Sequence, residues 1–250
     1  MRIPLFLAGL FCLLSGMAAI TYLEYDITPF ISWGNLLFVL LLTFGAGMAI
    51  FSPSLVTSSL KNGITFFFSP KPPLKEKSQK IIQLAALSRS DGLMALEKIP
   101  TKDSLLDHGI KLAIQGTPEK NVTAIMNIEL KTRIFSLRQS ARVLYTLMLL
   151  APLFGFVGTL TALVWENTTI TELSLDSIVL PTLYGFVLSA FFLAPLFFRL
   201  KEETHYMQRY GEFTLLGLRA VINGEHPSIV QEKLLVHLTK LPEKKHEPIF

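Results

Sequence analysis

Two stretches of this chain, Leu144 to Val164 and Ile178 to Phe198, contain no Asp, Glu, Lys, Arg or His. Each is as long as the roughly 20 residues that a helix needs to cross the hydrocarbon core of a bilayer. Two further apolar stretches, Ile3 to Ile20 and Ser32 to Phe51, are long enough or nearly so. Half of the 250 residues are hydrophobic and only 17% are charged. The sequence therefore predicts an all-α membrane protein with four transmembrane helices.

The distribution of basic residues predicts the orientation of these spans. The linkers Thr21–Ile31 and Trp165–Ser177 contain acids but no Lys or Arg, so all 23 basic residues lie on the other side of the predicted membrane. Because basic residues are enriched in cytoplasmic loops, we expect both linkers to face outward and both termini to be cytoplasmic.

The first stretch has a second interpretation. A lone Arg2, a short apolar run and the small residues from Gly16 to Ala19 also resemble a cleavable signal peptide. Its removal would leave three spans with the same orientation, so charge leaves both interpretations open. Cys12, the only cysteine, lies in this stretch, so no disulfide can form within one chain.

The segments between and after the spans predict further helices rather than strands, because no long stretch alternates apolar and polar residues. Apolar spacing predicts a helix from Ser78 with a weak point at Gly92, a second over Leu105–Ile114, and a third that starts near Pro118 and continues into the third span. Beyond the fourth span we expect a long helix over Arg199–Ile222, a short one over Ser228–Leu238 and a flexible last dozen residues.

Four regions follow from these boundaries. We expect two N-terminal transmembrane helices in 1–51, a cytoplasmic helical domain in 52–142, spans three and four in 143–198, and cytoplasmic C-terminal helices with a tail in 199–250. The cytoplasmic segments are too interrupted to predict a large core of their own. We expect them to pack as extensions of the membrane helices or against neighbouring subunits.

Small and hydroxyl-bearing residues follow one face of each of the last two spans. The stripes consist of Pro152, Gly155, Thr159 and Ala162, and of Thr182, Gly185 and Ser189, with Pro181 and Pro195 on either side of the second. Such faces allow close approach of two helices and present oxygen atoms between them. If an ion crosses the membrane here, another chain must supply the carboxylate.

Other classes of function lack their signatures. The five histidines show no HExxH or other metal-ligand spacing, and the sequence contains neither a GxxxxGK[S/T] loop nor a GxSxG motif. The basic residues are interleaved with acids and flank the membrane segments, which does not favour nucleic-acid binding. We therefore predict no enzyme, no bound metal, no cofactor and no nucleic-acid partner.

Five segments carry a resemblance to a known family. They are KIIQLAALSRSDGLMALEK, KLAIQGTPEKNVTAIMNIEL, APLFGFVGTL, TLYGFVLSAFFLAPL and AVINGEHPSIVQEKLL, which follow one another from Lys80 onward. In this order they resemble the MotA-type flagellar stator subunits of the MotA/TolQ/ExbB proton channel family.

The resemblance implies an ion-conducting stator subunit of the bacterial flagellar motor, in the inner membrane, that converts proton or sodium flux into torque. It implies five copies around two copies of a MotB-type subunit whose membrane helix carries an Asp, and contact with a FliG-like rotor protein. It also favours retention of the first span.

The same resemblance assigns roles to six residues. Pro152 and Pro195 match prolines that couple ion passage to conformational change, Thr159 and Thr182 match residues that face the partner's Asp, and Arg89 and Glu97 match the charged pair that engages the rotor. Pro181 and Ala162 depart from the family pattern, which leaves the choice of ion open.

Two other functions remain open. One is an energiser of the TolQ/ExbB kind, which moves a partner that spans the periplasm, and the other is a passive membrane scaffold. Threonines in membrane helices often bond to their own backbone, glycines and prolines often serve packing, and Arg89 and Glu97 also fit a solvated face. The two N-terminal spans and the Arg89/Glu97 segment favour the stator.

Overall fold

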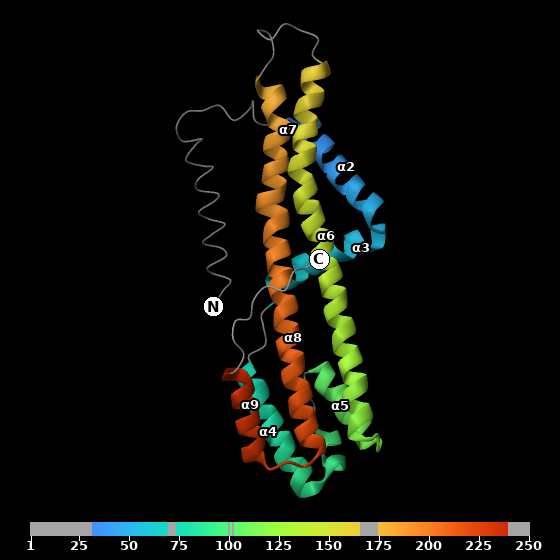
Figure 1. Cartoon of the computed structure of the whole chain (residues 1–250), viewed down its shortest axis with the longest axis vertical. Helices are drawn as coiled ribbons and strands as arrows, with labels where there is room; N and C mark the ends of the chain where they lie inside the picture. The colour runs from blue at the N-terminus through green and yellow to red at the C-terminus, as the bar shows by residue number, and fades with distance from the viewer. Residues whose placement is uncertain (1–31, 70–73, 100, 102, 166–174, 240–250) are drawn as a thin grey trace. The chain divides into compact units, whose positions relative to one another are not determined.

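The computed structural model describes residues 32–69, 74–99, 101, 103–165 and 175–239. By contacts, these residues divide into two compact units (Figure 1). The first contains the described residues of Met1–Ser69 and Ser140–Leu200, and the second those of Pro70–Gln139 and Lys201–Phe250. The expected first span and the C-terminal tail lie outside the described residues.

Three helices are long and apolar enough to cross a membrane, counted over the described part of the chain. Their apolar windows lie in Trp33–Ile50, Glu119–Val164 and Val179–Ile222. They contain the second, third and fourth spans expected from the sequence. Throughout the described residues the regular elements are helical and no strand occurs, which confirms the predicted all-helical class.

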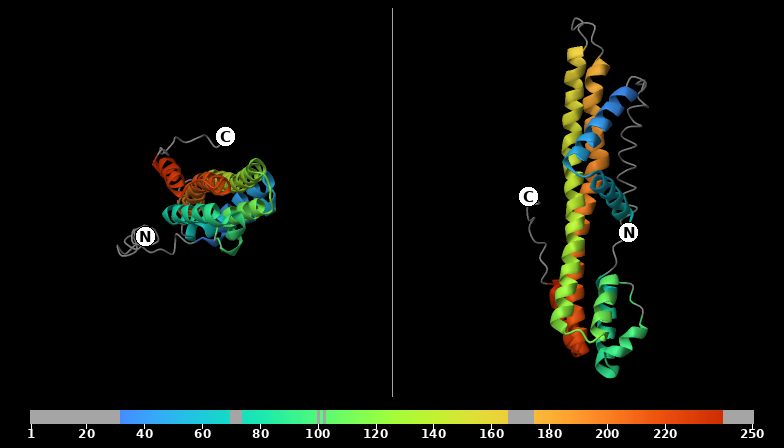
Figure 2. Two further views of the ribbon diagram at one scale, coloured as in Figure 1. Left: turned by 90° about the horizontal axis from the view of Figure 1, so that it is seen from below. Right: turned by 90° about the vertical axis from the view of Figure 1, so that its right-hand side faces the viewer.

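In its described residues, the first unit contains four helical segments. Helix α2 (Trp33–Ile50) is followed after a two-residue break by α3 (Pro53–Phe68), which begins with proline at a position where its missing N–H costs no hydrogen bond. The other segments are the second half of α6 (Glu119–Trp165) and α7 (Leu175–Val187) with its continuation. Figure 2 shows α6 as one unbroken helix of 47 residues, as predicted from the sequence.

The fourth span changes its helical form near Pro195. After α7 the chain forms a π-helix over Leu188–Leu193 and then α8 (Ala194–Ile222), so that the N–H of Ala194 donates to the carbonyl of Ser189 five residues earlier. Proline lacks the N–H that would continue the α-helical ladder, and π-turns are a common way to re-form the hydrogen bonds around such a gap. The fourth span therefore has a built-in irregularity that its sequence composition only hinted at.

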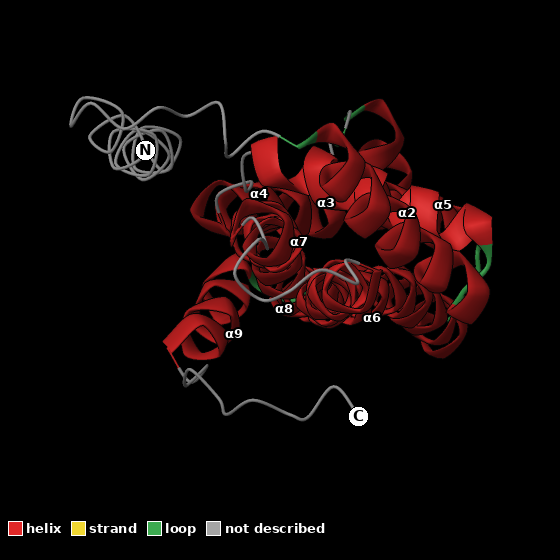
Figure 3. Cartoon of the chain, turned by 90° about the horizontal axis from the view of Figure 1, so that it is seen from above, coloured by secondary structure: helices red, strands yellow, loops and turns green. Residues whose placement is uncertain are grey.

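The described residues of the second unit form four shorter helices beside the ends of α6 and α8 that belong to it. They are α4 (Leu74–Asp91), a 3₁₀ helix labelled η2 (Leu93–Lys98), α5 (Ser104–Ile114) and α9 (Pro227–Thr239). Gly92 separates α4 from η2 and has a φ angle of 80°, which side chains other than glycine adopt only with strain. The red ribbons and short green connections of Figure 3 show how little irregular chain links these helices.

The second unit has a substantial hydrophobic core, and the expectation that these segments lack one was wrong. Buried residues from α4, η2, α5, α6, α8 and α9 form one cluster, which includes Ile81, Leu96, Leu106, Met126, Phe213 and Leu234. The reason is that parts of α6 and α8 belong to this unit and contribute to the core along their length, so the short helices need not form a core alone. Packing against extensions of the membrane helices is the part of the expectation that holds.

Candidate functional site

The hydroxyls of Thr159 and Thr182 meet between α6 and α7. They hydrogen-bond to each other, and each hydroxyl oxygen lies 3.3 Å from the carbonyl oxygen of Gly155. Because each hydroxyl has one proton, one threonine donates to the other, which is then free to donate to Gly155. Both threonines are half-buried. The two stripes of small residues thus face one another as the sequence predicted, and they bring three oxygen atoms together inside an apolar part of the chain.

Two glycines allow this close approach. A Cβ atom added to Gly155 would lie 2.7 Å from the carbonyl oxygen of Pro181, and one added to Gly185 would lie 2.5 Å from that of Ala151. Both contacts are with backbone atoms of the opposite helix, which cannot move aside as a side-chain tip can. Gly155 and Gly185 therefore set the distance between the helices that carry the two threonines.

Ser189 compensates for the proline inside α6. Pro152 has no N–H, so the carbonyl oxygen of Met148, four residues earlier, loses its usual α-helical donor. The hydroxyl of Ser189 donates to this oxygen at 2.7 Å from the opposite helix. The sequence placed Ser189 on the correct stripe but gave no sign of this contact, which joins the irregular region of α6 to the π-helix before Pro195.

Helix α2 packs beside the same region. A Cβ atom added to Gly158 on α6 would lie 3.2 Å from the ring of Phe38 on α2. The hydroxyl of Tyr184 accepts a hydrogen bond of 2.8 Å from the backbone N–H of Ser32. Sequence reasoning missed Tyr184, although a tyrosine two residues from Thr182 near a span end is typical of residues at a membrane boundary. The start of α2 is thereby tied to the helix that bears Thr182.

This arrangement supplies neutral oxygen ligands and hydrogen-bond donors without a negative charge. Among the described residues, no group of three or more His, Cys, Asp or Glu side chains is placed to hold a metal ion. Two hydroxyls and a carbonyl oxygen can solvate a proton-bearing or cation-bearing carboxylate, but they do not by themselves provide one. The site is therefore incomplete for ion transfer without an acid from elsewhere.

The predicted rotor-facing residues belong to the second unit. Arg89 is in the last turn of α4 and Glu97 is in η2, on either side of Gly92. Both side chains are exposed. The structure thus places this charged pair in a different unit from the threonine pair. The pair lies on the surface where α4, Gly92 and η2 follow one another.

Known proteins match both the sequence and the fold. The family model of the MotA/TolQ/ExbB proton channel family matches residues 98–174. Motility protein A of Cereibacter sphaeroides is 24% identical over 179 residues, which cover 70% of this chain and 71% of the relative. The chain is therefore similar in sequence to members of the MotA/TolQ/ExbB proton channel family.

Solved structures of family members have the same fold. The structure of C. jejuni MotAB matches with a TM-score of 0.82 and 17% identity over 97% of this chain and 98% of that one. The flagellar MotAB stator complex from Bacillus subtilis matches with a TM-score of 0.82 and 21% identity over 94% and 95%. The family resemblance seen in the five sequence segments is confirmed, and its fold extends over nearly the whole chain.

Proposed function

We propose that this chain is the ion-conducting stator subunit of a bacterial flagellar motor, which works with a MotB-type partner. The observation that supports it best is the pair of hydroxyls on Thr159 and Thr182, which lies between two close-packed apolar stretches, 144–164 and 178–198, that contain no carboxylate. A partner helix that brings an Asp to this pair completes an ion site. The transported ion is a proton or a sodium ion, and no cofactor takes part.

The carboxylate and the hydroxyl pair would work together in one cycle. An ionised Asp side chain inside the membrane has a high free energy, so it takes up a proton or cation from one side of the membrane. Until then, hydrogen bonds from the threonine hydroxyls stabilise the carboxylate. Loss of the ion changes the hydrogen bonds that Thr159 and Thr182 make. Pro152 and Pro195 flank this region with a missing N–H each, and the π-helix next to Pro195 gives α8 a place to bend.

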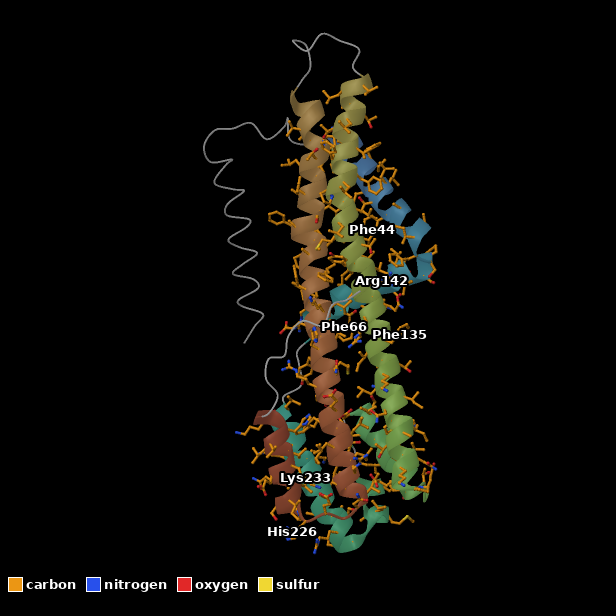
Figure 4. All side chains as sticks on the ribbon, in the orientation of Figure 1. Phe44, Phe66, Phe135, Arg142, His226 and Lys233 are labelled. Carbon is orange, nitrogen blue, oxygen red and sulfur yellow. The ribbon has the colours of Figure 1, made fainter. Side chains whose placement is uncertain are left out.

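The assembly we propose has four spans, with both termini in the cytoplasm, and five copies of this chain around two partner subunits in the inner membrane. Apolar side chains outside the expected spans support self-association. Phe135, 61% exposed, projects outward from α6 in a part of the helix that lipid tails do not cover (Figure 4). Ile128 lies seven residues before Phe135, on the same face of the helix, and is 66% exposed.

The rotor contact in this proposal is the exposed segment with Arg89 and Glu97. Two opposite charges that flank a tight turn fit a partner surface with complementary charges, such as that of a FliG-like rotor protein. Exposed pairs of this kind guide the register and rate of association more than its affinity.

Co-expression with candidate partners tests the proposal. We would purify the complex with single-span, Asp-bearing subunits and measure its native mass, then ask whether the pair restores swimming to cells that lack their own stator. A complex of five chains with two partners that restores swimming supports the stator. An assembly that instead energises a partner spanning the periplasm supports the TolQ/ExbB kind, and a homo-oligomer that binds no such partner contradicts both.

A further inference from the structure

Lys77 is a buried cation in the second unit. Its side chain is only 5% exposed, although it lies on α4 among residues that are mostly at the surface. The ammonium group forms an ion pair with Asp103, donates to the hydroxyl of Thr214, and lies 3.2 Å from the centre of the Tyr210 ring. Three segments of the chain that are far apart in sequence thus converge on one charge.

Asp103 ties the same charge to α5. Its Oδ1 atom caps α5 by accepting from the N–H of Leu105 at 3.0 Å, while its Oδ2 atom faces Lys77. The Tyr210 hydroxyl also hydrogen-bonds to Asp103. We call Lys77, Asp103, Tyr210 and Thr214 the polar clasp; it joins the start of α4, the start of α5 and the middle of α8.

Between the clasp and the end of α4, two further contacts join α4 to α8. Ile81 packs where Gly217 has no side chain, and the hydroxyl of Ser88 donates to the carbonyl of Val221 at 2.8 Å. These contacts form in the same register as the clasp. A charge that must meet a carboxylate, a hydroxyl and a ring face at once has one position only.

The buried charge is an unfavourable way to add stability. Burial lowers the pKa of Lys77 to about 8, although the Asp103 carboxylate and its hydrogen bond act in the opposite direction. Desolvation therefore outweighs the attraction of the partner charge. Replacement of buried ion pairs by apolar residues is often neutral or stabilising, and the best-attested use of such pairs is to fix register.

We infer that Lys77 is a positioning residue, whose ammonium group locks the register of α4 on α8 and so holds the Arg89/Glu97 segment in place. The functional half of this inference rests on the proposed stator role, since Arg89 is at the opposite end of α4 from the clasp. Helix α8 is continuous with the fourth span through Pro195. A fixed register lets α8 carry the rotor-facing segment with it.

The other titratable groups around the clasp either keep one protonation state near neutral pH or act on Tyr206 rather than on Lys77 directly. Burial raises the pKa of Tyr206 to about 12 and that of Tyr210 further, so both phenols remain neutral. Glu203 and Arg209 on α8 act on Tyr206. Lys77 and Asp103 are therefore the charges that decide whether the clasp is closed.

Spin labels on α4 and just beyond α8 test the register directly in the full complex. Ala86 and Asn223 are both exposed, and Cys12 is the only native cysteine, so Ala86→Cys and Asn223→Cys in a Cys12→Ser background give one labelled pair in each chain. Mixing labelled with an excess of unlabelled chains leaves the distance within one chain as the one measured. Double electron–electron resonance then reports the distance distribution. The test variant is Lys77→Met with Asp103→Asn, which removes both charges, and asparagine still caps the start of α5 well. The control is Lys75→Met, which replaces an exposed lysine on the same helix.

We expect a narrow distribution in the unaltered clasp and in Lys75→Met, and a broad one in the double variant. We also expect rising pH to favour the closed clasp, because the pKa of Lys77 is lower when it is buried, so the distribution of the unaltered clasp should stay narrow or narrow further between about pH 7 and about pH 9.5, and that of the double variant should not change. A distribution that stays narrow in the double variant, or one that broadens with rising pH in the unaltered clasp, overturns the positioning role.

Swimming and ion flux separate this inference from the proposed function. With a stator, the double variant loses swimming while ion flux through the complex is retained; normal swimming with a broad distribution overturns the link to the rotor. If the unaltered complex restores no swimming, the proposed function fails while the spin-label result still decides the register. Should the double variant not assemble, Thr214→Val removes the hydroxyl that accepts from Lys77 and donates to the carbonyl oxygen of Tyr210, leaves both charges in place, and must broaden the same distribution.

Discussion

The hydroxyl of Thr159 on α6 hydrogen-bonds to the hydroxyl of Thr182 on α7, and both hydroxyl oxygens lie 3.3 Å from the carbonyl oxygen of Gly155, which accepts from one of them. Each hydroxyl has one proton and two lone pairs, so the pair keeps lone pairs free for a third group. A protonated carboxylic acid that enters between them can donate to one hydroxyl, whereas an ionised one can only accept. The pair can therefore distinguish the two states of a partner's acid.

Thr182→Val tests this role without a change of side-chain shape. Loss of the hydroxyl removes a hydrogen bond worth about 1 kcal/mol, which leaves folding and assembly intact, but it removes the contact with the acid. We expect swimming and ion flux to fall together while the native mass of the complex is unchanged. Thr161→Val is the matched control, because Thr161 is exposed on α6 and its hydroxyl donates to its own helix at Val157; equal effects of the two changes would contradict the ion-site assignment.

Gly185→Ala tests the close approach of the helices. The added methyl group would lie 2.5 Å from the carbonyl oxygen of Ala151, so α6 and α7 must separate, at a cost of about 1–3 kcal/mol. We expect lower thermal stability of the purified complex and loss of swimming. Gly45→Ala on α2 meets nothing within 4 Å and should leave stability unchanged or slightly higher. A fully stable Gly185→Ala complex would show that the helices do not pack as closely as described.

Reversal of the exposed charges tests the rotor contact. The double variant Arg89→Glu with Glu97→Lys keeps the net charge but inverts its pattern on both sides of Gly92. We expect slower swimming with unchanged ion flux, because the change affects association with the rotor and not the ion path. Lys120→Glu, at an exposed position on α6, should have little effect. Unchanged swimming in the double variant would remove Arg89 and Glu97 from the rotor contact.

The stability of α4 should depend on pH through Lys77. Its pKa is lowered from 10.5 to about 8 in the folded protein, so between these values the unfolded chain binds one more proton than the folded one. The free energy of unfolding therefore rises with pH across this window, by at most about 3 kcal/mol, and the cost of the charged form is fully present below it. Hydrogen exchange of α4 amides, compared at each pH with Lys77→Met, should show the difference; parallel pH profiles for the two proteins would contradict it.

The helices whose ends are set by local signals were predictable. Gly116 with Pro118, and Gly224 with Pro227, break the chain wherever they occur, so α5, α6, α8 and α9 begin or end within a few residues of the expected positions. The meeting of Thr159 and Thr182 was also predictable, since each lies on a stripe of small residues that has only one compatible surface nearby. Their proposed roles in ion transfer stay predictions.

Long-range polar contacts were not predictable. Lys77 and Thr214 are 137 residues apart, and nothing in the surroundings of Lys77, which lies in a lysine-rich segment, distinguishes it from its exposed neighbours. The core of the second unit was missed for a related reason. Met126 and Phe213 belong to helices that looked like exposed extensions when each segment was considered alone, and they are buried only because α4, α5 and α9 cover them.

The length of α6 has a mechanical consequence. A helix of 47 residues measures about 70 Å from Glu119 to Trp165, at about 1.5 Å per residue. Such a rod acts as a lever arm: each degree of tilt about one end displaces the other by about 1 Å. A tilt of a few degrees at one end of such a helix would therefore displace its other end by several ångströms.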